Sequence, residues 1–270
     1  MSFIAVGIGN TSVQIGIFGA VAAAASSESA IPIPVPANHL TFPVASGEWT
    51  GPAGLAKAIP DDLPKDTPWF IASVNRPTAT EIINWLDATQ PDATVHLLKN
   101  SQFPIEILTD RPDAVGTDRI AAATAVKQLK QKNNAAIFAD AGTAITVNAI
   151  SREGKFLGGA ILPGTTTASR ALNKSTDQLP EVIVRADQPE PAFIGSDTHP
   201  AIASGVYWGA IGAVRELMGR MTTELTDTTT PPDLFVTGGF GPALAKHLDL
   251  NVTYIPHLVL SGIALAADNT

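Results

Sequence analysis

Two stretches of this chain decide the fold, because each joins an apolar strand to a polar turn that contains glycine. The first is Ile4–Thr11, with the sequence IAVGIGNT, and the second is Ala136–Thr143, with the sequence AIFADAGT. Each turn leads into another β-rich run, Ser12–Phe18 in the first case and Ala144–Asn148 in the second. The pattern predicts two β-hairpins whose glycines let backbone amides approach a ligand, an arrangement suited to phosphate. The repetition predicts a duplicated domain.

Either turn also has a purely conformational explanation, since Gly, Asn, Asp and Thr are common turn residues. For one turn alone that explanation would be preferred. Two copies, each with a glycine past the strand end and a threonine just after it, favour a function.

The composition is that of an ordinary globular protein. The chain has 270 residues, of which 45% are hydrophobic, and a net charge of −8. This acidic balance argues against a broad nucleic-acid surface, which depends on clustered Lys and Arg. The chain has no cysteine, so disulfides and thiolate metal sites are excluded, and a reducing compartment fits.

The amino terminus carries no recognisable targeting or membrane signal. The first basic residue is Lys57, whereas a signal peptide begins with a charged region, and the apolar run Ile15–Ala25 is too short to span a bilayer. We therefore expect a cytoplasmic protein that does not bind membranes.

Strands and helices are expected to alternate twice along the chain. After the first hairpin and a proline-rich surface loop at 20–37, the first half is expected to hold strands and helices at Leu40–Val44, Trp49–Ala58, Trp69–Val74, Thr78–Thr89, Ala93–Leu98, Pro104–Leu108 and Asp118–Lys130. After the second hairpin, the second half is expected to hold them at Leu157–Leu162, Thr165–Leu172, Pro200–Met221, Leu234–Val236 and from about Leu258. This order predicts an α/β protein of two similar halves.

Several familiar motifs are absent from the sequence. Gly154-Lys155-Phe156 lacks the hydroxyl that a Walker A motif requires, and Gly7-Ile8-Gly9 lacks the third glycine of the dinucleotide fingerprint. There is no Gly-x-Ser-x-Gly elbow and no His-Glu-x-x-His pair, and the five histidines are scattered. A P-loop, a Rossmann site, a serine hydrolase and a zinc hydrolase are all disfavoured.

Two acidic residues are candidates for chemistry. Asp118 lies in Gly116–Arg119 at a loop-to-helix junction, where it is either a helix cap or a general base for a substrate hydroxyl, with Arg119 beside it to hold a carboxylate or phosphate. Asp140 at a strand end either caps its own turn or holds a cation beside nucleotide phosphates.

Glycines and a threonine mark three further places. Gly238 and Gly239 form either a tight turn or a space for adenosine. The glycines of Gly158–Gly164 suggest close approach of another backbone or of a ligand, although turn chemistry explains them equally well. Thr198, before His199-Pro200, is a natural helix cap.

The order of these motifs resembles that of the type III pantothenate kinases. The motifs are, in chain order, Gly9–Thr11, Gly116–Arg119, Asp140–Ala144, Gly158–Gly164, Thr198 with Ile202 and Gly205, and Thr237–Gly239. They span almost the whole chain, and together they are far more specific than any one of them.

The resemblance implies a fold and a division of the chain. The family shares the fold of acetate kinase, sugar kinases, Hsp70 and actin, in which duplicated ribonuclease H-like halves form a nucleotide cleft between them. It implies an N-terminal half at residues 1–115 and a C-terminal half at residues 116–270, whose last helix could pack back on the first half.

The resemblance also implies an activity. This activity is ATP-dependent phosphorylation of pantothenate to 4′-phosphopantothenate, the first step of coenzyme A biosynthesis, by an enzyme that uses Mg²⁺ with ATP and a monovalent cation, K⁺ or NH₄⁺. The family is usually homodimeric, with the second subunit helping to form the substrate site. Asp118 would accept the proton of the primary hydroxyl, and Asp140 would hold the monovalent cation. The other implied contacts are Gly7, Ile8, Gly9, Asn10, Thr11, Ser12, Val13, Gln14, Thr143, Gly238 and Gly239 for the nucleotide, and Gly116, Thr117, Asp118, Arg119 and Thr198 for pantothenate.

Two positions depart from the family pattern. The first motif normally begins with an aspartate that helps to place the Mg²⁺ where this chain has Gly7, and an aspartate is common where it has Asn148. Loss of such a group typically costs about 10 to 100-fold in metal affinity or activity, so a slow enzyme is expected. Two alternatives stay open: a nucleotide-binding regulatory protein with impaired catalysis, and a kinase for another small hydroxy acid.

Overall fold

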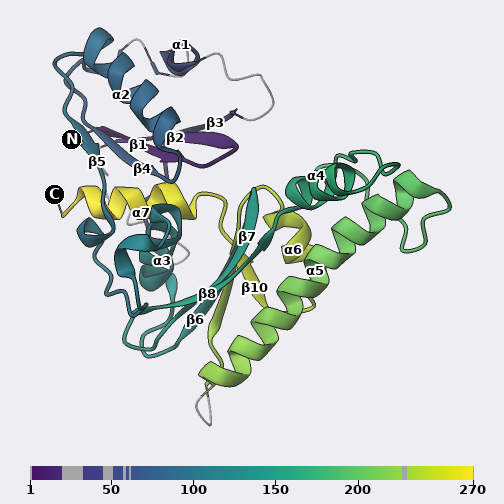
Figure 1. Ribbon diagram of the computed structural model, residues 1–270. Helices are drawn as coiled ribbons and strands as arrows, with labels where there is room; N and C mark the ends of the chain where they lie inside the picture. The colour runs from purple at the N-terminus through teal and green to yellow at the C-terminus, as the bar shows by residue number, and fades with distance from the viewer. Residues whose placement is uncertain are drawn as a thin grey trace. The chain divides into compact units, whose positions relative to one another are not determined.

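The computed structural model describes residues 2–19, 33–44, 51–56, 59–60, 62–226 and 230–269 (Figure 1). The chain forms two compact units, of which one contains residues 1–129 together with 257–270 and the other contains residues 130–256. The last helix therefore belongs to the first unit. The division of the sequence between residues 115 and 116 stays a prediction.

The first unit is built on a five-stranded mixed sheet in the order β3-β2-β1-β4-β5. Its strands are β1 (Phe3–Ile8), β2 (Ser12–Phe18), β3 (Asn38–Pro43), β4 (Trp69–Ser73) and β5 (Val95–Leu97). The first three strands pair antiparallel, whereas β4 and β5 add in parallel on the other side of β1. Because β1 and β4 are parallel neighbours, their carboxyl ends lie side by side at one edge of the sheet.

Helices cover both faces of this sheet. On one face, Ile4 and Val6 of β1 share a core with α2 (Arg76–Thr89), whose first turn is capped by Asn75. On the other face α7 (Leu258–Ala267) packs against β1, and α3 (Thr117–Leu129) packs against α7. Successive β1 side chains point to opposite faces, so Gly7 faces α7. Among the described residues of this unit, the other helical segments are α1 (Pro52–Ala56) and the 3₁₀ turns η1 (Asn100–Gln102) and η2 (Pro112–Ala114).

The second unit repeats the same sheet, in the order β8-β7-β6-β9-β10. Its strands are β6 (Ala136–Ala141), β7 (Ala144–Ile150), β8 (Phe156–Pro163), β9 (Asp233–Thr237) and β10 (Val252–Tyr254). As in the first unit, an antiparallel hairpin and a third antiparallel strand are followed by two parallel strands. The repeated pairing confirms the predicted α/β class and the duplication.

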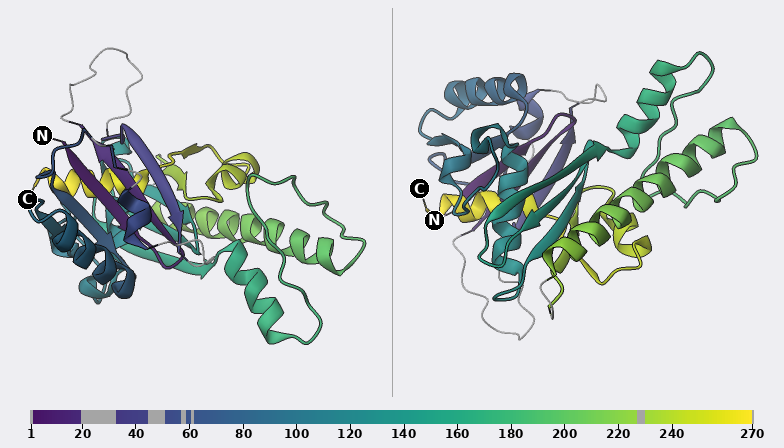
Figure 2. Two further views of the ribbon diagram at one scale, coloured as in Figure 1. Left: turned by 90° about the horizontal axis from the view of Figure 1, so that it is seen from above. Right: turned by 60° about the horizontal axis from the view of Figure 1, so that its bottom comes forward.

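The helices of the second unit leave an arm beyond the sheet. The long α5 (Thr198–Leu225) shares a core with β6 and β7 through side chains such as Ile137, Val147 and Val214. The amino-terminal part of α5 and α4 (Thr165–Ser175) extend away from the sheet, as both views in Figure 2 show. A short helix, α6 (Gly241–His247), follows β9. None of the described helices is long and apolar enough to cross a membrane.

One expectation from the sequence is contradicted by this structure, and two short elements were not expected. The strand expected at Pro104–Leu108 is wrong: Ile105 is a buried anchor of an irregular loop, which Lys127 holds by donating to the Pro104 carbonyl. The sequence did not predict α6 or β10, which are too short to leave a clear periodic pattern. Residues 20–32 of the expected surface loop, and residues 49–50 and 57–58 of the helix expected at Trp49–Ala58, lie outside the described residues.

Candidate active site

The first hairpin turn follows β1 directly. The Gly9 amide donates to the Ser12 carbonyl (2.9 Å), and the Val44 amide donates to the Thr11 carbonyl (2.8 Å). Asn10 at the tip is exposed, but the side chains of Ile8 and Val13 belong to the core of the first unit. Those two residues can therefore meet a nucleotide only through their backbone.

The Gly116–Arg119 motif opens α3 and holds its aspartate in a defined place. Asp118 is mostly buried, and its Oδ1 accepts a hydrogen bond from the Arg119 amide (2.8 Å). A Cβ on Gly116 would lie only 2.6 Å from the same oxygen, so glycine leaves the space that the carboxylate occupies. Thr117 begins the helix, and Asp118 lies in its first turn.

The electrostatics of Asp118 are those of a carboxyl withdrawn from water. Burial raises the pKa of Asp118, and the Arg119 backbone amide and guanidinium oppose this rise only in part. Burial also lowers the pKa of Arg119, and the negative charge of Asp118 raises it again in part. A carboxylate with a raised pKa is a better proton acceptor, as a general base requires.

The structure brings these two motifs of the first unit to the same edge of the sheet. Val74, directly after β4, donates its amide to the carbonyl of Ile8 at the end of β1 (2.9 Å). A Cβ on Gly116 would lie 3.4 Å from Cγ1 of Val74. Val74 therefore lies between the end of β1, where the hairpin turn begins, and the loop that precedes Asp118.

Gly7 carries no metal-binding group, and little space remains beside it. A Cβ at this position would lie 3.3 Å from Cγ1 of Val259 and 4.0 Å from Cδ1 of Ile263, both in α7. The place of the family aspartate thus faces apolar side chains.

In the second unit, Asp140 and Gly238 lie together although they are far apart in sequence. β6 and β9 are parallel, with Asp140 paired to Thr237. Gly238 has a φ of +85°, and a Cβ there would lie 2.6 Å from both Asp140 Oδ1 and the Ala141 carbonyl oxygen. The first glycine of the Gly238-Gly239 turn is therefore required both for the backbone conformation and for the close approach of Asp140.

The turn that contains Thr143 is braced by residues that the sequence did not assign to a site. The Thr143 carbonyl accepts from the Gly164 amide (3.0 Å) and from Thr167 Oγ1 (2.7 Å). A Cβ on Gly164 would overlap the Gly142 carbonyl. The glycine-rich run Gly158–Gly164 thus permits the predicted close approach of another backbone.

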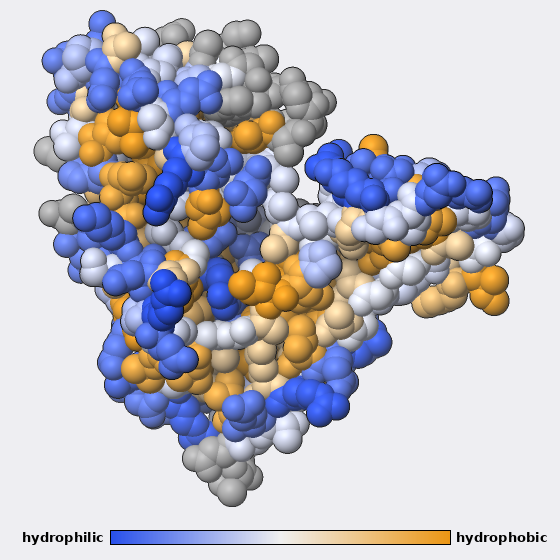
Figure 3. All heavy atoms as spheres, viewed as in Figure 1, coloured by the Kyte–Doolittle hydropathy of each residue, from blue (hydrophilic) through white to orange (hydrophobic). Residues whose placement is uncertain are grey.

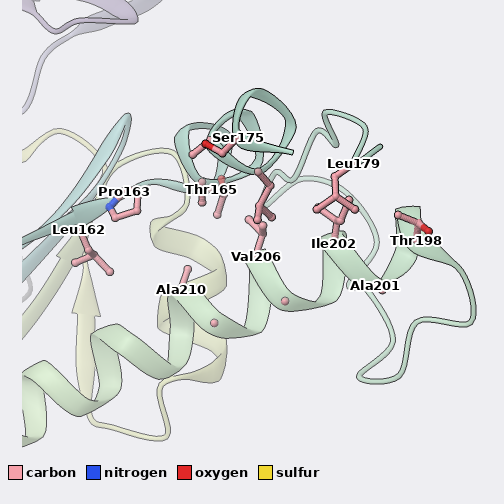
Figure 4. A pocket seen from close by; sticks show the side chains of 15 residues that line it. Leu162, Pro163, Thr165, Ser175, Leu179, Thr198, Ala201, Ile202, Val206 and Ala210 are labelled. Atoms are coloured by element: carbon pink, nitrogen blue, oxygen red, sulfur yellow. The ribbon is translucent and has the colours of Figure 1, made fainter. Parts of the chain in front are cut away.

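Thr198 lies elsewhere in the second unit, at the start of α5. The cap of this helix is Asp197, whose Oδ1 accepts from the Thr198 amide (2.6 Å), so the expectation that Thr198 is the cap is wrong. Thr198 instead lines an apolar cavity of about 920 Å³ between α4 and α5. Figure 4 shows Thr198 and Leu162 at opposite ends of the lining, and Figure 3 shows apolar residues between the two helices and hydrophilic ones on the outer side of α4.

Asn148, the second departure from the family pattern, is fully buried in β7. Its Nδ2 donates to Thr146 Oγ1 (2.9 Å). An aspartate could not donate this hydrogen bond.

Comparison with known proteins places the chain in a family. A family model described as type III pantothenate kinase matches residues 3–220. The chain belongs to the type III pantothenate kinase family. A type III pantothenate kinase from Dehalococcoides mccartyi is 31% identical over 263 residues, which cover 97% of this chain and 95% of that protein. Another from Gluconobacter oxydans is 33% identical over 68% of this chain and 64% of its own length.

Solved structures share the fold of this type III pantothenate kinase family member at much lower identity. A Campylobacter jejuni protein described as a Baf family transcriptional activator has a TM-score of 0.56 and 19% identity, over 98% of both chains. A Sinorhizobium meliloti protein described as a 2-dehydro-3-deoxygalactonokinase has a TM-score of 0.53 and 13% identity, over 98% of both chains. These likenesses show the fold alone, which is that of the actin-like ATPases and sugar kinases.

A type III pantothenate kinase implies ATP and a divalent metal ion, and the described residues allow one mode of binding it. They contain no group of three or more His, Cys, Asp or Glu side chains that could hold a metal ion. Mg²⁺ usually keeps several waters and is bound through one or two carboxylates together with substrate phosphates. In the second unit Asp140 supplies one carboxylate at the end of β6, whereas Gly7 contributes none from the first.

Proposed function

We propose that this chain transfers the γ-phosphoryl group of ATP to the primary hydroxyl of pantothenate, which gives 4′-phosphopantothenate and begins coenzyme A biosynthesis. The observation that carries the proposal is the position of Asp118. It is a mostly buried carboxyl at the start of α3, and the loop before it lies at the same sheet edge as the first hairpin turn. Family membership supports pantothenate as the acceptor.

Asp118 is proposed as the general base. Its raised pKa favours uptake of the proton from the substrate hydroxyl as the new P–O bond forms. Positioned general bases contribute about 10² to 10⁴-fold to rate. Arg119 is proposed to hold the pantothenate carboxylate, which a guanidinium can bind through two parallel hydrogen bonds. Gly116, Thr117 and Thr198 are proposed as the other pantothenate contacts.

The nucleotide is proposed to contact both hairpin turns. In the first unit the contacts are the backbone of residues 7–14 and the polar side chains of Asn10, Thr11, Ser12 and Gln14. In the second unit they are Thr143, Gly238 and Gly239. A divalent cation bound to the phosphates would neutralise the charge that develops during transfer.

Three further points rest on the family and are also proposals. Asp140 is proposed to hold a monovalent cation, K⁺ or NH₄⁺, in addition to its place near the nucleotide. The active form is proposed to be a homodimer in which the partner completes the pantothenate site. The cytoplasm, where ATP is available, is the proposed compartment.

The decisive assay uses purified protein with ATP, Mg²⁺, K⁺ and pantothenate. ADP and 4′-phosphopantothenate should appear in equal amounts, and Asp118→Asn should lower kcat by at least about 100-fold. Asp113→Asn is the matched control, because Asp113 is an exposed carboxylate five residues earlier in the same loop. Absence of product at every metal concentration would contradict the proposal.

Omitting K⁺ in the same assay tests the monovalent cation, and light scattering tests the dimer.

No observation favours the regulatory alternative, since the likeness to the Campylobacter jejuni protein is one of fold alone. A kinase for another hydroxy acid would be recognised by turnover on a substrate panel without pantothenate.

A further inference from the structure

We propose that Asn100 is a positioning residue for the Gly116–Arg119 motif. Asn100 is the first residue of η1, and only 7% of its surface is exposed. Its Nδ2 donates to the carbonyls of Pro112 (2.9 Å) and Val115 (2.8 Å). Val115 directly precedes Gly116, so the amide of Asn100 holds the peptide group from which the motif begins.

The orientation of this amide follows from its partners. Both partners are backbone carbonyls, which only accept hydrogen bonds, so the NH₂ group of Asn100 must face them. Both of its donor hydrogens are thereby used. An aspartate has almost the same shape but no donor when ionised, so it would place a negative oxygen against two carbonyls.

The oxygen of the same amide is in an unfavourable environment, which the two donated hydrogen bonds must offset. Asn100 Oδ1 is buried and has no hydrogen-bond partner among the described residues. A buried acceptor without a donor destabilises the folded state. The side chain is therefore poorly explained as core filling, and its two donated hydrogen bonds are the contribution that the structure does show.

A shift of the Val115–Gly116 peptide would reach the carboxylate directly. Oδ1 of Asp118 stands 2.6 Å from where a Cβ of Gly116 would be, and the amides of Arg119 and Ile120 donate to the Gly116 carbonyl (3.0 and 3.3 Å). The Val115–Gly116 peptide, the first turn of α3 and the Asp118 carboxylate are therefore in direct contact with one another. Displacement of a reacting group by about 1 Å can cost about 10²-fold in rate.

The consequence for turnover rests on the proposed function, whereas the clamp itself can be tested without turnover. Asn100→Asp and Asn100→Ala remove both donated hydrogen bonds. Ile82→Ala is the stability control, because Ile82 is fully buried in the α2 core and distant in sequence from this loop. In both Asn100 variants, amide hydrogen exchange at residues 116–120 should accelerate at least about tenfold relative to Ile82→Ala at matched stability.

The kinetic part of the test compares the two substrates. Both Asn100 variants should lower kcat/KM for pantothenate by about 10 to 100-fold, leave the KM for ATP within about twofold and shift the pH profile of kcat/KM. Ile82→Ala should lower thermal stability without these changes. Unchanged exchange at 116–120 in Asn100→Asp would overturn the proposal, as would wild-type kcat/KM in a less stable Asn100→Asp protein.

The two proposals fail in different ways. If the wild-type protein does not phosphorylate pantothenate, the proposed function fails, and hydrogen exchange still decides whether Asn100 clamps the motif. If the wild-type protein turns over and Asn100→Asp is kinetically indifferent, only the role of Asn100 fails.

Discussion

Val259 in α7 fills the space beside Gly7 in β1. The 3.3 Å between Val259 Cγ1 and the site of a Gly7 Cβ is tighter than an ordinary carbon contact. Gly16 in β2 also allows α7 to approach the sheet, because a Cβ there would lie 3.1 Å from Cδ1 of Leu260; Gly262 instead allows α7 to approach α3, because a Cβ there would overlap the Ala121 backbone. A side chain at position 7 therefore requires the Val259 side chain to move.

Restoring the family aspartate should not by itself restore the metal site. Gly7→Asp forces a carboxylate against apolar atoms of α7, and overpacking of this kind typically costs about 1–3 kcal/mol. The double variant Gly7→Asp/Val259→Ala should recover part of that stability and bind ADP with Mg²⁺ more tightly than the wild type does. Urea unfolding and calorimetry with and without Mg²⁺ measure the two effects.

Val259→Ala alone is the control for this pair. It loses packing but gains no carboxylate, so its Mg²⁺-dependent affinity for ADP should not change. A Gly7→Asp protein as stable as the wild type would refute the role of Val259.

Gly116→Ala should damage catalysis more than folding. The added methyl group would meet Oδ1 of Asp118, which must rotate away. We expect kcat to fall by about 10 to 100-fold because the base is misplaced, with ADP affinity unchanged. Steady-state kinetics and calorimetry provide the measurement.

The control for Gly116→Ala is Gly219→Ala in α5, where no atom lies within 4 Å of the added Cβ. Replacing a helical glycine by alanine stabilises by up to about 1 kcal/mol, so this variant should be at least as stable as wild type and fully active. Full activity in Gly116→Ala would show that the placement of Asp118 does not depend on this glycine.

The sequence predicted the elements that local patterns determine. Both hairpins, the long α5 and the last helix were found because each has a long periodic pattern or a turn with characteristic residues. Pro104–Leu108 was wrong because the apolar residues at 105 and 107 imitate a strand, whereas burial of Ile105 instead anchors a loop. A seven-residue helix and a three-residue strand, α6 and β10, leave too little pattern to detect.

The candidate site divides in the same way. Residues next to a turn or a helix start, such as Asp118 and Asp140, could be selected from local chemistry and motif order. Asn100 could not, because its importance lies in contacts with carbonyls 12 and 15 residues further along the chain. Val259 could not be selected either: the resemblance implied that the last helix could pack back on the first half, but only the folded chain shows which of its side chains lies beside Gly7.

Gly238 and Gly239 are adjacent, yet only the replacement of Gly238 should lower stability. Gly238→Ala puts a side chain at a φ of +85° and within 2.6 Å of the Ala141 carbonyl oxygen. The variant should lose about 1–3 kcal/mol of stability from strain and should bind ADP poorly. Gly239→Ala meets no atom within 4 Å, so its unfolding free energy should stay within about 0.5 kcal/mol of wild type. Equal stability of the two variants in urea unfolding would contradict the geometry of this turn.

The contact between His39 in β3 and His257 before α7 should make the first unit less stable in mild acid. The two rings lie 4.1 Å apart, and burial lowers the pKa of both; the charge of His257 lowers that of His39 further. As the pH falls, a histidine whose pKa is lowered in the folded state is protonated first in the unfolded state. The free energy of unfolding therefore decreases as the pH drops below the ordinary histidine pKa of about 6.5. Well above that pH, both histidines are neutral in both states and the pair does not make stability depend on pH. Urea unfolding at pH 7.5 and 5.5 should show a smaller loss for His39→Gln and for His257→Gln than for the wild type, because each variant removes one titrating partner. A wild-type protein that loses no more stability than these variants between the two pH values would refute the coupling of the pair.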